Sequence, residues 1–243
     1  MKLNCDMGES FGIWTMGLDD QVMPWIDMAN IACGFHASDP DVMAATVKKA
    51  IQNNVTIGAH PGYEDKKGFG RRSVPHSQSE ISHLVAYQVG ALQGVCSLYG
   101  GKVEYVKPHG ALYNDMMADK TVFEAVVTGV SSLSGNPSLM ILATADNSQY
   151  QAVARAKGVS ILLEAFADRA YTHEGKLSPR SQPGSVYHDS KQIIDQVTTL
   201  AKHGYVTALD GSKLVLNADT VCVHGDNPES VATVKALSKA LTP

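Results

Sequence analysis

The stretch Ala29-Asn-Ile-Ala-Cys-Gly-Phe-His36 contains the pattern that decides the fold: a short apolar run of strand length passes into glycine and ends on histidine. Three more histidines follow similar runs, in Val55-Thr-Ile-Gly-Ala-His60, Tyr105-Val-Lys-Pro-His109 and Val221-Cys-Val-His224. The first run, Lys2-Leu-Asn-Cys-Asp6, ends on an acid. A barrel of parallel strands gathers its strand ends on one face, where such barrels carry their active sites. The repetition therefore predicts an enzyme whose polar residues meet in one pocket.

Apolar runs of strand length alternate with helical patterns along the whole chain. The expected strands are Leu3–Cys5, Ala29–Cys33, Thr56–Ala59, Glu104–Val106, Leu139–Leu142, Ser160–Leu163 and Thr220–Val223. Their mostly continuous apolar character suits a parallel sheet buried on both faces, and the alternation indicates βαβ units. Such a set fits either a seven-stranded (β/α) barrel or an open doubly wound sheet. Periodicity alone does not separate the two.

Helix signals are clearest at three places. Ser77-Gln-Ser-Glu80 has capping-box spacing, and its helix is expected to run toward Gly100–Gly101. Asp39–Pro40 and Asn227–Pro228 each place a capping side chain before a proline at the first helical position. Further helices are expected at about 119–132, 147–157 and 189–203. No linker or internal repeat interrupts the pattern, so residues 1–243 are expected to form one α/β domain.

Three long connections, residues 6–28, 60–76 and 166–188, follow expected strands, and loops of this length are usually functional or disordered. Their position at strand ends favours function. The first contains Gly8-Glu-Ser10-Phe-Gly12, which matches the G-x-S-x-G of a nucleophile elbow. Such an elbow needs a strand, a sharp turn and then a helix. Because Asp6 and Met7 are expected to lie beyond the strand, Ser10 is not assigned as a nucleophile.

The bulk composition excludes several classes of protein. A chain of 243 residues with 44% hydrophobic and 18% charged residues is typical of a soluble globular protein. A net charge of −4 without a basic run argues against nucleic acid, and no apolar stretch approaches the roughly 20 residues of a membrane span. The chain enters a strand at once, which leaves no room for a signal peptide and predicts a cytoplasmic location. The four cysteines form no C-x-x-C pair and are expected to be buried core residues.

Asp6 and the strand-end histidines support two kinds of chemistry. A pair of imidazoles with one carboxylate, as in Asp6, His36 and His60, could hold zinc or a similar divalent metal. The same groups could work without a metal, with a carboxylate activating water and an imidazole donating a proton. The residues alone leave both interpretations open.

Three cations near strand ends could bind a small acidic substrate. They are Lys107, Arg169 and Arg180. A guanidinium group can bind a carboxylate through two hydrogen bonds. The chain has no G-x-x-x-x-G-K-[ST] motif, so the sequence contains no recognisable nucleotide cradle.

Six motifs, in order, resemble the LamB/YcsF family, which includes the A subunits of bacterial ATP-dependent 5-oxoprolinases. They are Leu3-Asn-Cys-Asp6-Met-Gly-Glu9-Ser-Phe-Gly12, Ala29-Asn-Ile-Ala-Cys-Gly-Phe-His36, Gly58-Ala-His60-Pro-Gly-Tyr63, Val106-Lys-Pro-His109-Gly-Ala-Leu-Tyr113-Asn114, Glu164-Ala-Phe-Ala-Asp168-Arg169 and Val223-His-Gly-Asp226-Asn. They extend from residue 3 to past residue 226 without a departure from the family pattern. The resemblance implies a seven-stranded barrel similar to the glycoside hydrolase/deacetylase fold.

The resemblance also implies a function. The expected activity is cleavage of 5-oxo-L-proline (pyroglutamate) to L-glutamate coupled to ATP hydrolysis, with partner subunits B and C that activate the substrate with ATP. The expected catalytic residues are Asp6, His36, His60 and His109. The expected substrate-binding residues are Asn4, Glu9, Lys107, Arg169, His224 and Asp226. Two alternatives remain: a stand-alone metal-dependent deacetylase or amidohydrolase, and a non-catalytic scaffold whose pocket only binds.

Overall fold

A computed structural model describes residues 1–241 of the chain and contains a closed parallel barrel. Its strands, in order around the barrel, are β1 (Lys2–Met7), β2 (Met28–Ala32), β3 (Thr56–His60), β4 (Tyr105–Val106), β5 (Ser138–Leu142), β6 (Ile161–Phe166) and β9 (Thr220–Val223). Because β9 pairs with both β6 and β1, the parallel sheet closes on itself. The seven-stranded barrel is confirmed, and the open sheet is excluded.

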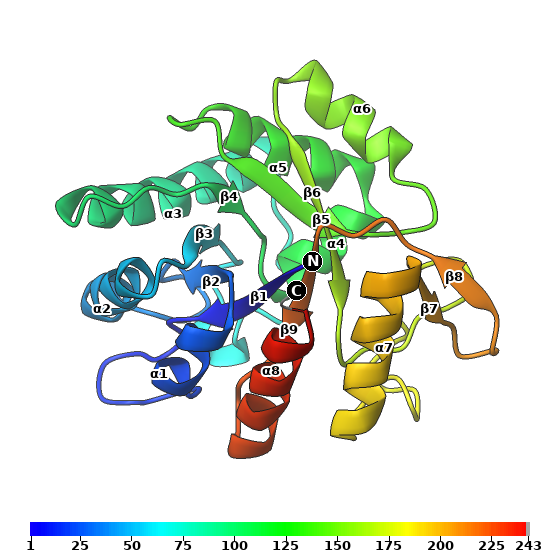
Figure 1. Ribbon diagram of the computed structural model, residues 1–243. Helices are drawn as coiled ribbons and strands as arrows, with labels where there is room; N and C mark the ends of the chain where they lie inside the picture. The colour runs from blue at the N-terminus through cyan, green and yellow to red at the C-terminus, as the bar shows by residue number, and fades with distance from the viewer. Residues whose placement is uncertain (242–243) are drawn as a thin grey trace.

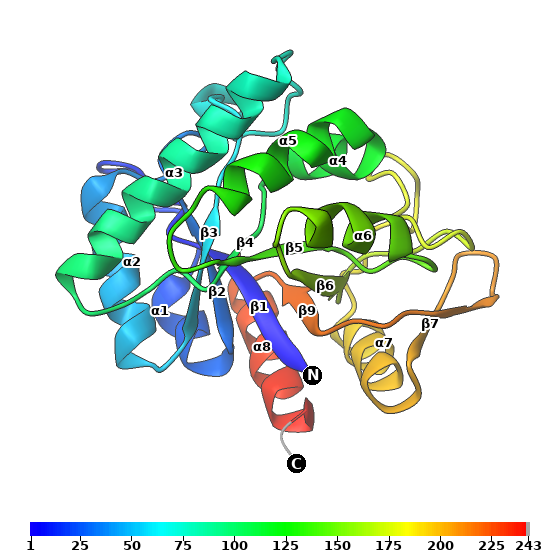
Figure 2. The same ribbon diagram turned by 90° about the horizontal axis from the view of Figure 1, so that it is seen from above.

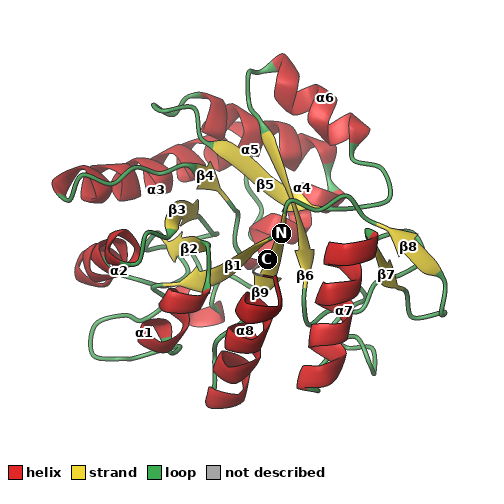
Figure 3. Cartoon of the chain, viewed as in Figure 1, coloured by secondary structure: helices red, strands yellow, loops and turns green. Residues whose placement is uncertain are grey.

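The longer helices surround the strands as an outer ring, which Figure 1 and Figure 3 show. The helices are α1 (Asp19–Val22), α2 (Pro40–Gln52), α3 (Gln78–Leu98), α4 (Gly110–Ala118), α5 (Lys120–Ser131), α6 (Ser148–Ala156), α7 (Ser190–His203) and α8 (Pro228–Leu241), with short 3-10 turns η1 (Met23–Trp25) and η2 (Lys66–Gly68). The capping box at the start of α3 is present, since Ser77 and Glu80 each accept a hydrogen bond from the other's backbone N–H. Within residues 1–241, no helix has both the length and the apolar character of a membrane span.

The sequence pattern did not predict helices α1 and α4 or an antiparallel hairpin outside the barrel, and it ended strands β1 and β6 too early. Helix α4 begins at Gly110, directly after a strand-end motif, and its buried residues include three in succession (Ala111, Leu112 and Tyr113), which hides the helical period. Strands β7 (Tyr205–Thr207) and β8 (Lys213–Val215) form an antiparallel hairpin outside the barrel, beside α7 in Figures 1 and 2. Strand β1 extends to Met7, so Asp6 and Met7 belong to the strand, contrary to expectation.

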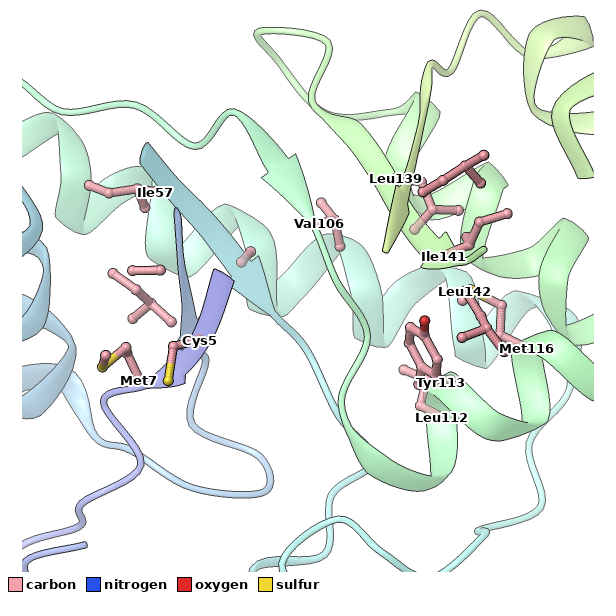
Figure 4. Close-up of a cluster of buried hydrophobic side chains, with 14 of the residues drawn as sticks. Cys5, Met7, Ile57, Val106, Leu112, Tyr113, Met116, Leu139, Ile141 and Leu142 are labelled. Atoms are coloured by element: carbon pink, nitrogen blue, oxygen red, sulfur yellow. The ribbon is translucent and has the colours of Figure 1, made fainter. Parts of the chain in front are cut away.

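Two apolar regions enclose the strands. The larger lies between the barrel and its helices; Figure 4 shows part of it, where Met116 of α4 lies beside Leu142 of β5. The smaller contains Met28, Tyr105 and Met140. Successive strand residues point to opposite faces. Met28 precedes Asn30 by two positions on β2, and the Tyr105 hydroxyl donates to Asn30 Oδ1 at 2.7 Å, so the smaller cluster supports a polar layer nearer the strand ends.

The barrel interior depends on a glycine at position 58. Gly58 pairs with Tyr105 across β3 and β4, and a Cβ at this position would overlap the Tyr105 ring. We expect Gly58→Ala to lower the free energy of unfolding by about 1–3 kcal/mol or more, because the core must move to relieve the overlap. Denaturant unfolding measures the change. The control is Gly90→Ala on α3, where a Cβ has open space and should be neutral or stabilising by up to about 1 kcal/mol. Equal effects of the two changes would contradict this packing of the barrel interior.

Candidate active site

Asp6, near the carboxyl end of β1, is held on three sides. Its Oδ1 accepts hydrogen bonds from Asn30 Nδ2 at 2.8 Å and Lys107 Nζ at 3.2 Å, and its Oδ2 lies 3.4 Å from His60 Nε2. Burial would raise the pKa of Asp6. The charges of His60 and Lys107 outweigh that effect and hold the pKa well below its ordinary value. Asp6 is therefore ionised at neutral pH.

Lys107 directly follows β4, and its ammonium group lies inside the barrel. Nζ is 3.2 Å from Asp6 Oδ1 and 3.0 Å from Glu164 Oε2, and it donates to Asn4 Oδ1 and Cys222 Sγ. Burial would lower the pKa of Lys107, but Asp6, Cys222 and Glu164 raise it well above its ordinary value. Asn4 and Glu164 are fully buried, so they position Lys107 from beneath the site.

Three histidines and one glutamate form a compact group beside Asp6. His109 Nδ1 lies 2.9 Å from His60 Nε2, and the rings of His109 and His36 stack with centroids 3.7 Å apart. Glu9 Oε1 lies 3.5 Å from His36 Nε2 and 3.7 Å from His109 Nδ1. One donor atom from each of these four residues lies within 4.8 Å of the others, so the group could hold a metal ion.

The expected metal set of Asp6, His36 and His60 is divided between two groups. His36 and His60 belong to the Glu9 group, whereas Asp6 groups with Cys222 and His224. Asp6 still lies close to His60, with its Oδ2 3.4 Å from Nε2, but the turn after β1 brings Glu9 to the other histidines. Gly8, with φ of 69°, allows that turn and lets Glu9 reach the histidines.

Burial dominates the electrostatics of the Glu9 group. It lowers the pKa of His36 well below the ordinary value and that of His109 to about 3, and the neighbouring histidines lower both further. Burial and the charges of Asp6 and Asp226 raise the pKa of Glu9 to about 8. Gly70, with φ of 62°, closes over the rings, since a Cβ there would meet His36 and His109.

A second ionised pair faces Asp6 from the other side. The ends of β9 and β1 are adjacent, with Val223 opposite Cys5, as the barrel prediction requires. His224 then follows β9, and its Nδ1 lies 2.9 Å from Asp168 Oδ2. Burial would lower the pKa of His224, but Asp168 raises it to about 9, so the imidazole is protonated at neutral pH. A ring nitrogen of His224 and a carboxylate oxygen of Asp6 lie within 4.8 Å of each other.

These groups border a cavity of about 600 Å³ at the strand ends. Of the residues expected from sequence, the lining includes Asp6, Glu9, His60, Lys107, His109, Arg169, Arg180, His224 and Asp226. His36 and Asn4 lie behind the lining. A smaller adjoining cavity of about 270 Å³ extends toward α7 and α8 and shares Arg71, Arg180, His224 and Asp226 with the first.

Two residues that the sequence analysis considered, Arg169 for substrate binding and Ser10 as a nucleophile, hold loops in place. The Arg169 guanidinium donates to the carbonyls of Ser178 at 2.6 Å and Ser185 at 3.4 Å, so it fastens the 166–188 connection while lining the cavity. The Ser10 hydroxyl exchanges hydrogen bonds with the backbone of Met16 inside its own loop. This bonding gives Ser10 a role in shaping the loop, and among residues 1–241 no basic side chain bonds to its hydroxyl to make it a nucleophile.

Five residues that matter to this geometry were not predicted as site residues from the sequence: Asn30, Glu164, Asp168, Tyr113 and Arg71. The sequence could have indicated Asn30 and Glu164, because each is a polar residue within an apolar strand and a buried polar side chain needs a polar partner. Tyr113 lines the cavity from the unpredicted helix α4. Arg71 lines the cavity from the glycine-rich loop after β3. The sequence has two adjacent arginines there, and it does not show which of them points into the cavity.

Comparisons with known proteins agree on one family. The profile of the LamB/YcsF family matches residues 1–243. A Vibrio vulnificus protein, named as the A subunit of 5-oxoprolinase, is 57% identical over 241 residues, covering 99% of this chain and 97% of that protein. The Pseudomonas fluorescens protein of the same name is 55% identical over 241 residues, covering 99% and 96%. The crystal structure of the lactam utilization protein from Thermus thermophilus superposes with a TM-score of 0.92 at 37% identity, covering 99% of this chain and 95% of that one.

The His224–Asp168 pair makes stability depend on pH. A pKa raised from 6.5 to about 9 gives a contribution that is complete below pH 6.5 and is lost as pH rises through 9. We expect this loss to be roughly 2–3 kcal/mol, allowing for the partial exposure of the imidazole. Denaturant unfolding at several pH values between 6.5 and 9 measures it. Glu9 also titrates in this range, so the prediction concerns the difference between wild type and His224→Gln. Parallel stability curves for the two proteins would contradict it.

Proposed function

Because the chain belongs to the LamB/YcsF family, we propose that it is the A subunit of an ATP-dependent 5-oxoprolinase, which cleaves 5-oxo-L-proline to L-glutamate. The observation that carries the proposal is a pair of oppositely charged groups bordering one cavity. Asp6 is ionised and His224 is protonated, and their polar atoms lie within 4.8 Å. Such a pair provides both a base and an acid at neutral pH.

A lactam carbonyl is a poor electrophile, so the ring needs activation before water can attack. Phosphorylation of the carbonyl oxygen provides it, and we assign this step to partner subunits that bind ATP. Asp6 then accepts the proton of the attacking water, while His224 donates a proton to the ring nitrogen as the C–N bond breaks. Asp168 orients His224 through Nδ1, which leaves Nε2 for this proton transfer. Both proton transfers use groups already in the required protonation state. Ring opening leaves an acyl phosphate on the former carbonyl carbon, and a second water cleaves it to L-glutamate and inorganic phosphate.

The cavity also has cations for an acidic substrate. Arg71 and Arg180 line the junction of the two cavities, and either guanidinium can bind a carboxylate through two hydrogen bonds. Lys107 contributes positive charge from within the barrel, although its Nζ already contacts Asp6 and Glu164. We propose that the arginines bind the carboxylate or the phosphoryl group of the activated lactam and that Lys107 keeps Asp6 ionised.

The loop between β1 and α1 supports docking of partner subunits B and C near the cavity. Ile13 and Trp14 are 90% and 64% exposed, and Phe11 and Met16 of the same loop are also exposed. Met16 lines the cavity, so this apolar surface borders its opening. Contiguous exposed apolar side chains favour association with another protein. Docking here would let a labile phosphorylated intermediate reach the cavity without crossing bulk water.

Reconstitution tests the proposed activity. The purified chain alone should neither hydrolyse ATP nor open 5-oxoproline at a useful rate, because the lactam is not activated. With subunits B and C added, glutamate should form, and Asp6→Asn should lower kcat by about 10²–10⁴-fold, because the amide cannot accept the proton. Circular dichroism confirms that the variant is folded. Robust glutamate production by the chain alone would favour a self-sufficient amidohydrolase. Unchanged turnover of Asp6→Asn in the complex would favour a non-catalytic scaffold.

The docking surface has its own test. Replacing Trp14 by Ser should weaken binding of the partner subunits by at least about tenfold, because a large apolar anchor is lost. Isothermal titration or co-purification measures the affinity. The matched control is Leu98→Ser, since Leu98 is 74% exposed but ends α3, whose carboxyl end lies at the opposite face of a (β/α) barrel. Equal binding by the two variants would place the partner interface elsewhere.

A further inference from the structure

The group of Glu9, His36, His60 and His109 contains buried polar atoms without hydrogen-bond partners. In the described residues, neither ring nitrogen of His36 has one, nor does Glu9 Oε1. His36 is only 1% exposed, and its Nε2 and Glu9 Oε1 approach each other at 3.5 Å. Unsatisfied buried groups are rare in folded proteins and often mark the place of an ion or water.

Backbone carbonyls fix the tautomers of the other two histidines. His60 Nδ1 lies 2.6 Å from the carbonyl of Lys107, and His109 Nε2 lies 2.8 Å from the carbonyl of Phe69. Carbonyl oxygens only accept hydrogen bonds, so both of these nitrogens carry hydrogen. In the neutral rings, the lone pairs are then on His60 Nε2 and His109 Nδ1. These are the two nitrogens that face each other at 2.9 Å.

Two facing lone pairs repel unless a cation lies between or beside them. That cation is either a proton shared by the two rings or a metal ion. A shared proton would join His60 and His109 but would leave His36 Nε2 and Glu9 Oε1 unpaired. A metal ion would use all four groups. The other nitrogens of His60 and His109 donate to backbone carbonyls, as is usual for metal-binding histidines.

The spacing of the donor atoms suits a transition metal. Bonds of about 2.0–2.1 Å in a tetrahedral site place neighbouring donors about 3.3 Å apart. Three of the donor separations are 2.9 Å for His60 and His109, 3.5 Å for His36 and Glu9, and 3.7 Å for His109 and Glu9. Three imidazoles and one carboxylate favour zinc and similar ions over magnesium or calcium, which prefer oxygen ligands.

We propose that Glu9, His36, His60 and His109 form a site for one divalent transition metal ion of the zinc type. The ligand atoms are Glu9 Oε1, His36 Nε2, His60 Nε2 and His109 Nδ1. The site lies beside Asp6 at the edge of the cavity, which Glu9, His60 and His109 line, and the buried His36 completes it from behind. It is independent of the proposed 5-oxoprolinase activity, since it concerns binding and not turnover.

Metal titration of the full chain tests the site without an activity assay. The protein is stripped with a chelator and titrated with Co²⁺, followed by visible absorption, and then with Zn²⁺ in competition. We expect one equivalent to bind, with Zn²⁺ displacing Co²⁺. Glu9→Gln and His36→Gln should each weaken binding by about 100-fold or more, since even changes outside the ligands of metal sites cost about 10–100-fold. The matched control, His83→Gln on the exposed face of α3, should leave affinity unchanged.

A second measurement covers the case in which a variant fails to fold. In the wild-type chain, Zn²⁺ should shift the ring NMR signals of the buried histidines and leave that of His83 in place. Binding with unchanged affinity in both ligand variants would overturn the proposal, and so would millimolar affinity for Co²⁺ and Zn²⁺. Unshifted signals of the buried rings would also overturn it. A proton shared by His60 and His109 would then account for their approach.

Discussion

One buried ammonium group connects the parts of this site. Lys107 Nζ forms ion pairs with Asp6 and Glu164 inside the barrel, and removing one partner of such a buried arrangement typically costs about 3–5 kcal/mol. The same residue acts through its backbone, because its N–H donates to the Ala59 carbonyl at 2.8 Å and its own carbonyl accepts from His60 Nδ1 at 2.6 Å. Lys107 thus keeps Asp6 ionised with its side chain and sets the tautomer of His60 with its main chain.

Barrel closure places Asp6 between two chemically different halves of the site. On one side of β1, loops and strand ends from β2, β3 and β4 carry the buried histidines, whose pKa values are low for His36 and His109. On the other side, β9 brings His224, which Asp168 keeps protonated. In an open sheet, β9 and β1 could be far apart. The site therefore requires the closed sheet.

Much of this arrangement could be predicted from sequence because it follows from position along strands. Short apolar runs locate the strands, and a polar residue near each end marks the face on which Asp6, His60, His109 and His224 meet. Contacts between side chains of different strands could not be predicted. The hydrogen bond between Asn4 and Thr220 and the ion pair between Lys107 and Glu164 depend on barrel closure and strand register. The participation of Glu9 could not be predicted for a related reason, since the turn at Gly8 brings it to the histidines, whereas Asp6 groups with Cys222 and His224.

The contrast between the two halves follows from what surrounds each imidazole. His36 and His109 stack on each other under Gly70, where burial lowers the pKa of both rings more than the charge of Asp6 raises it. His224 has the same ring, but the ionised Asp168 lies 2.9 Å from it and the cavity opens beside it. Neutral imidazoles have lone pairs to offer a metal, whereas a protonated imidazole can only donate. The same residue type at equivalent strand ends therefore supplies ligands on one side of Asp6 and an acid on the other.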